Sequence, residues 1–272
     1  MDHEIRNKYD HLLEILREKK KLAVAFSGGV DSTFLLYAAK QALGDDVTAF
    51  TVMSVFSPER ESREAEQFCA EHGIRQVLVP VDVLKVEGIA CNPVDRCYLC
   101  KKALFGKLLE MAKERGIDSV AEGSNLDDMG DYRPGMKAIG ELKVLSPLRE
   151  AELTKAQIRE LSRAFHLPVW NKPSFACLAS RFAYGETITE EKLGMVERAE
   201  ELLRSLGFVQ FRVRIDRKTA RIEVLPEQFA RLAEDAVRVR VTEELHRMGF
   251  SYVSMDLDGY RTGSMNAEIP YQ

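Results

Sequence analysis

The chain contains no long hydrophobic run, and this absence bears on where the protein works. No apolar stretch approaches the roughly 20 residues that a membrane-spanning helix needs, although 45% of the 272 residues are hydrophobic. The first four residues, Met1-Asp2-His3-Glu4, are polar or charged apart from the initiator, so no secretory signal is visible. We therefore expect no membrane partner and a location in the cytoplasm.

Cysteine is scarce, and so is an excess of positive charge. Five cysteines in a reducing cytoplasm do not indicate a disulfide framework. The net charge is −4 and the isoelectric point is near 5.9. Proteins that bind a polyanion such as tRNA usually present a basic face, so a nucleic-acid partner is not expected. Internal repeats and low-complexity tracts are also missing from the sequence.

Two common nucleotide-binding patterns are absent. The chain has neither the Lys-Ser/Thr pair of a Walker loop nor the G-x-G-x-x-G spacing of a dinucleotide-binding turn. These absences argue against a γ-phosphate-transferring ATPase and against a dinucleotide enzyme. A different turn, Ser27-Gly28-Gly29-Val30-Asp31-Ser32, joins the apolar run 22–26 to a helical pattern that starts at residue 33.

This glycine-rich turn has the properties of an anion site. The free N–H groups and the positive dipole end of a helix N-terminus point to one spot, and Gly28 and Gly29 allow the backbone to approach a phosphate closely. The hydroxyl groups of Ser27 and Ser32 add donors. Asp31 is therefore a candidate Mg²⁺ ligand beside the phosphates, and the alternative is a carboxylate that only complements the helix dipole.

The order of the elements predicts an α/β fold with a doubly wound parallel sheet and a smaller C-terminal α+β domain. From about residue 185 the pattern changes to α-β-β-α-β, so we predict two domains, 1–184 and 185–272. In the first domain we predict strands at 22–26, 47–52, 76–80 and 119–121 and helices at 4–20, 32–43, 58–72, 101–115 and 153–165. In the second we predict helices at 188–206 and 227–248 and strands at 208–215, 221–225 and 252–257.

The predicted strands indicate where two groups of polar residues lie. Asn125, Asp127 and Asp128 follow a strand, which places them at the carboxyl edge of the sheet, where open α/β sheets bind ligands; a polar surface loop is the alternative. The strand 208–215 alternates, with Val209, Phe211, Val213 and Ile215 predicted on the inner face and Arg212 and Arg214 on the other face.

The cysteines form a separate pattern. Cys97-Tyr98-Leu99-Cys100 is a C-x-x-C, and Cys177 lies far downstream. Three thiolates can hold a [4Fe–4S] cluster and leave one iron open, whereas a structural zinc site would normally need a fourth ligand. A redox pair or unrelated thiols are the other interpretations of the C-x-x-C. Cys69 is predicted to be a buried small residue, and Cys91 is an alternative ligand.

Several stretches together resemble known families. The hexapeptide 27–32 resembles the PP-loop of the ATP pyrophosphatases. The whole set resembles the ATP-dependent sulfur transferases that help to make the nickel-pincer nucleotide cofactor of lactate racemase, the LarE family. The narrowest match is Pro173-Ser174-Phe175-Ala176-Cys177-Leu178-Ala179-Ser180-Arg181. The other matching stretches are Glu122–Asp128, Ser146–Arg149, Lys155 with Ile158-Arg159, Trp170–Arg181, Phe211–Arg214, Ala220–Val224 and Asp256–Arg261.

The resemblance implies a reaction in two steps. ATP adenylates a carboxylate of pyridinium-3,5-biscarboxylic acid mononucleotide with release of pyrophosphate, and sulfur then displaces AMP to give a thiocarboxylate. It also implies the cofactors ATP, Mg²⁺ and a [4Fe–4S] cluster, a homo-oligomer such as a hexamer, and a sulfide donor and a nickel-inserting protein as partners. Domain 1–184 would be the PP-loop domain, and 185–272 would serve the substrate and oligomerisation.

The positions of the residues and the resemblance together suggest individual roles. Cys177, Asp31 and Arg181 would be catalytic, and Cys97, Cys100 and Cys177 would hold the cluster. Family members with one cysteine at position 177 surrender its sulfur and keep dehydroalanine, so a sacrificial Cys177 is the alternative to the cluster. The predicted nucleotide-binding residues are Ser27, Gly28, Gly29, Asp31, Ser32, Gly123 and Asn125, and the predicted substrate-binding residues are Ser180, Arg181, Arg212 and Arg214.

Other interpretations of the chain stay open. It could be a PP-loop tRNA thiolase, a nucleotide-binding module whose cysteines hold a structural metal, or an amide-forming PP-loop ligase without its glutaminase. For Arg181 the alternative to a substrate clamp is a solvent-facing side chain. Glu197 and Glu200 lie one helical turn apart, and we expect a solvated helix face there rather than a second cation site.

Overall fold

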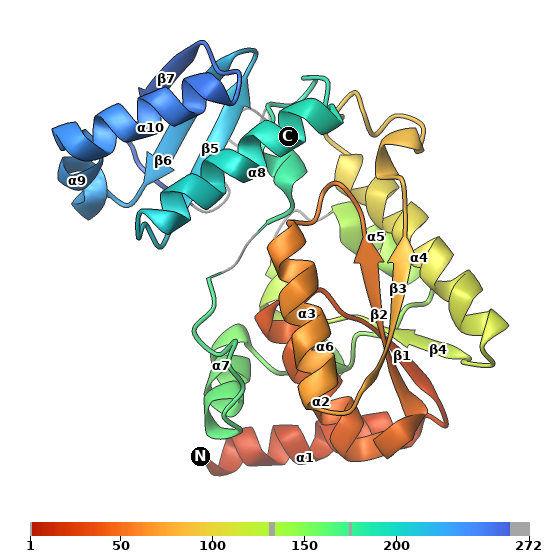
Figure 1. Cartoon of the computed structure of the whole chain (residues 1–272). Coiled ribbons are helices and arrows are strands. Elements are labelled where there is room, and N and C mark those ends of the chain that lie inside the picture. The colour runs from red at the N-terminus through yellow and green to blue at the C-terminus, as the bar shows by residue number, and fades with distance from the viewer. Residues whose placement is uncertain (1, 131–133, 174–175, 262–272) are drawn as a thin grey trace. The chain divides into compact units, whose positions relative to one another are not determined.

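The computed structural model of the chain describes residues 2–130, 134–173 and 176–261 (Figure 1). The chain divides into two compact units, the first of residues 1–83 and 97–175 and the second of residues 84–96 and 176–272. The domain boundary at residues 184 and 185 stays a prediction. In the described residues, no helix is both long and apolar enough to cross a membrane.

The first unit is built on a parallel sheet. Its strands are β1 (Leu22–Ala25), β2 (Val47–Met53), β3 (Arg75–Pro80) and β4 (Ser119–Ala121), in the order β3-β2-β1-β4. All three strand pairs are parallel. The strands read as apolar runs because helices cover both faces of such a sheet. The α/β fold predicted from the sequence is therefore confirmed.

Successive residues of β1 enter opposite hydrophobic cores, as the alternation of a strand requires. Leu22 and Val24 pack in the core that includes Leu12, Phe34 and Leu161. Ala23 packs on the other face with Phe105, Leu108 and Ile139. The helices of the first core are α1 (His3–Arg17), α2 (Val30–Leu43), α3 (Glu59–Glu71), α6 (Pro147–Glu150) and α7 (Lys155–Ala164), and those of the second are α4 (Arg96–Glu114) and α5 (Pro134–Glu141).

Local signals locate some of these helices well and others poorly. The helix predicted at 153–165 is α7, which Thr154 caps and for which Gln157 completes a capping box. The helix predicted at 101–115 begins five residues earlier, at Arg96, so the C-x-x-C lies within its first five residues. Helices α5 and α6 were not predicted. Short 3-10 helices span Gly44–Asp46, Val83–Lys85, Leu126–Gly130, Leu178–Arg181 and Pro226–Gln228.

The second unit has the predicted α-β-β-α-β order. Helix α8 (Glu190–Ser205) precedes β5 (Phe211–Asp216) and β6 (Thr219–Val224), which pair antiparallel. Strand β7 (Tyr252–Met255) pairs parallel with β6, so the sheet order is β5-β6-β7. Helix α8 contacts β5 and α10 (Asp235–Arg247), and α10 contacts β7.

Two predictions for this unit are wrong. The long helix predicted at 227–248 divides into α9 (Phe229–Ala233) and α10, because Glu234 is extended with φ −55° and ψ 133°. The break puts the Asp235 carboxylate in the first turn of α10, where it complements the helix dipole. The strand predicted at 208–215 begins three residues later than predicted, at Phe211. Val209, which was predicted to lie on its inner face, is 62% exposed.

Candidate functional site

The glycine-rich turn connects β1 to α2 as the sequence predicts. Gly28 has a φ of +72°, a left-handed conformation that favours glycine, and a Cβ added there would lie 3.3 Å from the carbonyl oxygen of Glu61. The hydroxyls of Ser27 and Ser32 are 3.1 Å apart, and the Ser32 hydroxyl donates to the Gly29 carbonyl. The turn therefore closes on itself in front of the N-terminus of α2.

A cavity of about 360 Å³ opens at this turn. Its size is in the range of small-molecule sites. Its lining includes polar groups of the turn, such as Asp31 and Ser32, and apolar side chains, such as Phe50 and Leu108. A cavity that combines a helix N-terminus with apolar side chains suits a nucleoside triphosphate, whose phosphates need donors and whose base needs an apolar surface.

The structure brings Asp31 together with residues that are distant in the sequence. The Lys155 ammonium forms an ion pair with Asp31 Oδ2, and Asn125 Nδ2 lies 3.3 Å from Asp31 Oδ1. Asp31 therefore faces a cation and an amide donor at the edge of the cavity. Its side chain is 23% exposed, so the carboxylate is accessible to a metal ion that arrives with the nucleotide.

The loop that follows β4 is held by its own side chains. Asn125 N–H donates to Asp128 Oδ2 at 2.9 Å, and Asp127 N–H donates to Asn125 Oδ1 at 3.0 Å. Asp127 Oδ2 in turn accepts from the Lys155 N–H at 2.8 Å. The contact of Asn125 with Asp31 puts this loop beside the glycine-rich turn; that the loop binds a ligand stays a prediction.

Gly123, predicted to bind the nucleotide, lies against the glycine-rich turn. A Cβ added at Gly123 would be 2.9 Å from the Ser32 nitrogen and 3.2 Å from the carbonyl carbon of Asp31. Both atoms belong to the backbone, so the contact could be relieved only by a shift of the turn. Glycine at 123 thus sets the distance between the end of β4 and the start of α2.

We predict that Gly123→Ala destabilises the protein by about 1–3 kcal/mol, because an added methyl group overpacks the backbone of the turn. ATP affinity should fall with it, measured by calorimetric titration, since the anion-binding N–H groups of the turn would move. Gly106→Ala is the matched control: Gly106 lies within α4 with nothing inside 4 Å of an added Cβ. That variant should gain about 0.5–1 kcal/mol in urea unfolding. Equal effects of the two variants would contradict the role given to Gly123.

Two charged residues near the cavity were missed from the sequence. The buried Glu122 accepts from the hydroxyls of Ser124 at 2.8 Å and Ser146 at 2.6 Å. Lys172 Nζ donates to the Gly28 carbonyl at 2.9 Å and to Glu64 at 2.8 Å.

The interaction of Glu64 with Lys172 changes the pKa of Glu64. Burial by itself would raise the pKa of Glu64, but the hydrogen bonds and charges of Lys172 and Arg60 lower it.

The sequence carried a usable signal for only one of the two missed residues, Glu122 and Lys172. Lys172 is 144 residues from Gly28, so no local pattern could have indicated the contact. For Glu122, its place directly after β4 was a usable signal.

The three cysteines of the predicted cluster are accessible. Cys97 is exposed and Cys100 half-buried in the first unit, and Cys177 is exposed in the second unit. Thiolates are the ligands that iron–sulfur clusters use, so the donor chemistry fits such a group. Across the described residues, no group of three Cys, His, Asp or Glu side chains is assembled for a metal ion. Ser174 and Phe175 of the matching stretch lie outside the described residues.

The remaining cysteines differ in exposure. Cys91 is exposed in the second unit. Cys69 is 3% exposed inside α3, and burial raises the pKa of its thiol to about 12. The prediction of a buried small residue at position 69 is confirmed, and a thiol so hard to ionise is a poor metal ligand.

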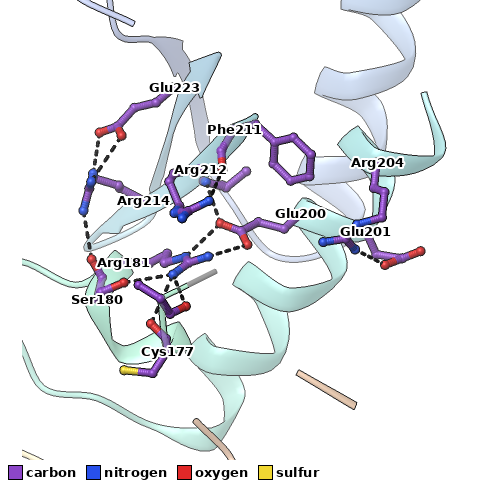
Figure 2. A network of polar contacts seen from close by, with 12 residues as sticks. Cys177, Ser180, Arg181, Glu200, Glu201, Arg204, Phe211, Arg212, Arg214 and Glu223 are labelled. Carbon is purple, nitrogen blue, oxygen red and sulfur yellow. Dashed lines mark hydrogen bonds and ion pairs between the residues drawn. The ribbon is translucent and has the colours of Figure 1, made fainter. Parts of the chain in front are cut away.

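Around Cys177, Arg181 and Glu200 form a buried ion pair (Figure 2). Arg181 is 1% exposed and Glu200 4% exposed. Arg181 Nε and Nη2 donate to the two carboxylate oxygens at 2.9 Å and 2.8 Å. Burial by itself would lower the pKa of Arg181, but the charge and the hydrogen bonds of Glu200, together with weaker nearby charges, raise it. The solvated helix face expected at Glu200 is wrong, because α8 turns this carboxylate toward Arg181.

Arg214 and Arg212 lie beside this pair (Figure 2). Arg214 binds Glu223 through two nitrogens and donates from Nη1 to the Ser180 carbonyl at 2.8 Å. Arg212 is 6% exposed and lies over the Tyr260 ring at 5.0 Å. Burial and the charge of Arg181 lower the pKa of Arg212. These three guanidinium groups outnumber the two carboxylates, which favours binding of an anion.

Comparison with known proteins gives a consistent result. A model of the PP-loop domain family matches residues 1–130. A pyridinium-3,5-bisthiocarboxylic acid mononucleotide synthase of Lactiplantibacillus plantarum is 39% identical over 257 residues, 94% of this chain and 92% of that protein. An uncharacterized protein of Synechocystis sp. is 38% identical over 262 residues, 96% of this chain and 98% of that protein. A tRNA-specific 2-thiouridylase of Clostridium perfringens is 28% identical over 196 residues, only 57% of this chain and 53% of that protein.

Proposed function

Because this chain belongs to the LarE family and is an enzyme with a PP-loop domain, we propose that it is an ATP-dependent sulfur transferase. Its substrate is pyridinium-3,5-biscarboxylic acid mononucleotide, whose carboxylates it converts to thiocarboxylates for the nickel-pincer cofactor. The observation that carries the proposal is the 39% identity over 94% of the chain to a synthase named for the bisthiocarboxylic product.

In the first step, a carboxylate oxygen of the substrate attacks the α-phosphorus of ATP, and pyrophosphate leaves. The cavity at the glycine-rich turn supports this step, since Ser27, Gly29 and Ser32 line it at the N-terminus of α2, where a helix favours bound phosphate. Asp31 has the oxygen chemistry and the exposure that a magnesium ion needs. Magnesium would stabilise the charge that develops on pyrophosphate.

In the second step, sulfur attacks the acyl carbon and AMP leaves, which is easier than loss of a carboxylate oxygen. We assign Cys177 to sulfur delivery. Cys97, Cys100 and Cys177 would together hold a [4Fe–4S] cluster, in keeping with their exposure and thiol chemistry. Such a cluster leaves one iron open for an additional sulfide. Sacrificial use of the Cys177 sulfur remains the alternative that the experiment below decides.

The second unit supplies the groups for the substrate in this proposal. Ser180, Arg212 and Arg214 would contact its phosphate, which suits the excess of guanidinium charge there. The region from residue 185 onward would also carry the contacts of a homo-oligomer. A sulfide donor and a nickel-inserting protein would act before and after this enzyme, in the cytoplasm.

Intact-protein mass after one turnover tests the function. Anaerobically purified protein receives ATP, Mg²⁺ and the pyridinium biscarboxylate mononucleotide. We expect pyrophosphate, AMP and thiocarboxylate, with the chain mass unchanged and with iron and labile sulfide present. Thiocarboxylate with loss of the mass of H₂S at Cys177 would replace the cluster by the sacrificial route. The absence of both pyrophosphate and thiocarboxylate would reject this substrate, and tRNA would be assayed next.

A further inference from the structure

The short segment around Cys177 is held by arginine side chains from three places in the second unit. Arg181 Nη1 donates to the carbonyl oxygens of Ala176 at 2.6 Å and Cys177 at 3.1 Å. Arg96 Nη1 donates to the Ala179 carbonyl at 3.0 Å, and Arg214 Nη1 donates to the Ser180 carbonyl at 2.8 Å. Four of the five carbonyl groups in segment 176–180 therefore accept hydrogen bonds from guanidinium groups.

Arg181 is itself fixed from the other side. Glu200 binds it through both carboxylate oxygens and also accepts from the Val213 N–H at 3.1 Å. This contact ties the guanidinium to α8 and β5 at once (Figure 2). Because the ion pair is bidentate, with two hydrogen bonds between the guanidinium and the carboxylate, the guanidinium has little freedom to rotate.

Stability is a weak reason for this arrangement. Apolar residues of similar volume often replace a buried ion pair without loss of stability, because removing two charges from water is costly. What an apolar pair cannot supply is the donor that faces Ala176 and Cys177. The Cys177 side chain is exposed while its carbonyl is anchored, so the arrangement fixes the main chain and leaves the thiol accessible.

We propose that Arg181, oriented by Glu200, is a positioning residue for sulfur transfer, which fixes the main chain at Cys177 through the carbonyl groups of Ala176 and Cys177. This inference rests on the proposed function, in which Cys177 delivers sulfur. In this role Arg181 acts on the reaction indirectly, by positioning Cys177. Direct binding of the substrate by Arg181 is a separate prediction. The three guanidinium nitrogens each donate to protein oxygens in this arrangement.

The double variant Arg181→Met/Glu200→Leu tests the inference in the full chain. It removes the donors without leaving one buried charge unpaired, so the fold should persist. We expect the kcat of thiocarboxylate formation to fall by about 10²-fold, as for a displaced reacting group. The KM values for ATP and substrate should not change, and pyrophosphate release should continue. Hydrogen exchange of the amides in 176–182 should become about tenfold faster or more, because charged hydrogen bonds are lost.

Arg204→Met/Glu201→Leu is the matched control. This ion pair lies on the same helix α8, and Arg204 lies over the Phe211 ring. The control should keep wild-type kcat and wild-type exchange in 176–182. Arg181→Lys is a second variant that keeps the positive charge but not the two-pronged geometry, and it should lose kcat with KM unchanged. It provides the test if the double variant fails to fold.

The readouts separate this inference from the proposed function. Fast exchange with a low kcat and unchanged KM supports the positioning role. Unchanged exchange, or fast exchange with normal kcat, overturns it. If wild-type protein makes no thiocarboxylate, the proposed function fails, and with it the positioning role in sulfur transfer; hydrogen exchange then still reports whether Arg181 holds the segment.

Discussion

Cys177→Ser should abolish thiocarboxylate formation and leave adenylation intact. Serine keeps the size of the side chain, but it can neither serve as the thiolate ligand of the proposed cluster nor supply sulfur to the acyl adenylate itself. Because the Cys177 side chain is exposed, the free energy of unfolding should change by no more than about 0.5 kcal/mol. Pyrophosphate release with ATP, Mg²⁺ and substrate should therefore continue, while mass spectrometry of the small-molecule products should find no thiocarboxylate.

Three other cysteine variants show how the sulfur is delivered. Cys97→Ser and Cys100→Ser should lose bound iron and thiocarboxylate formation if a cluster is used, and should retain activity if Cys177 is sacrificed. Cys91→Ser tests the alternative ligand, since Cys91 is also exposed and belongs to the same unit as Cys177; the proposed ligand set does not include it. It should keep both iron and activity. Wild-type amounts of thiocarboxylate from Cys177→Ser would remove Cys177 from the mechanism.

The features that the sequence predicted well depend on residues close together in the chain. The turn 27–32 follows its strand and precedes its helix directly, so its anion-binding geometry is a local property. The helix predicted at 153–165, which is α7 over Lys155–Ala164, depends in the same way on neighbouring residues. The parallel sheet follows from the alternation of strands and helices.

The features that the sequence missed depend on pairing over long distances. No local pattern around Glu200 indicates that it pairs with Arg181, which lies 19 residues earlier in the chain. Because Glu197 lies one helical turn from Glu200, a solvated helix face was the simpler interpretation. Lys172 and Gly28 are 144 residues apart. The division of the predicted helix 227–248 had a different cause: its residues favour helix, and the extended conformation of Glu234 overrides that preference.

Asp31→Asn should lower the rate of pyrophosphate release by about 10²–10³-fold, the size expected when one group that stabilises transition-state charge is lost. Asparagine is nearly the same size and keeps one oxygen, but it lacks the charge that binds a divalent cation. The Mg²⁺ concentration needed for half-maximal rate should rise as well. Stability should fall by only about 0.3–1 kcal/mol, because the carboxylate also complements the dipole of α2 and pairs with Lys155 at a partly exposed position.

The Mg²⁺ dependence separates the two roles considered for Asp31. A carboxylate that only stabilised α2 would lower the melting temperature of the variant without moving the Mg²⁺ requirement. Asp45→Asn is the matched control, since Asp45 follows the same helix and pairs with Lys40 at 2.7 Å, but its side chain is 97% exposed. That variant should keep the wild-type rate and Mg²⁺ requirement. If Asp31→Asn had the same rate of pyrophosphate release and the same Mg²⁺ requirement as Asp45→Asn, another group of the cavity would have to hold the phosphate-bound cation. Asp128 also lines the cavity and would be the next carboxylate to replace.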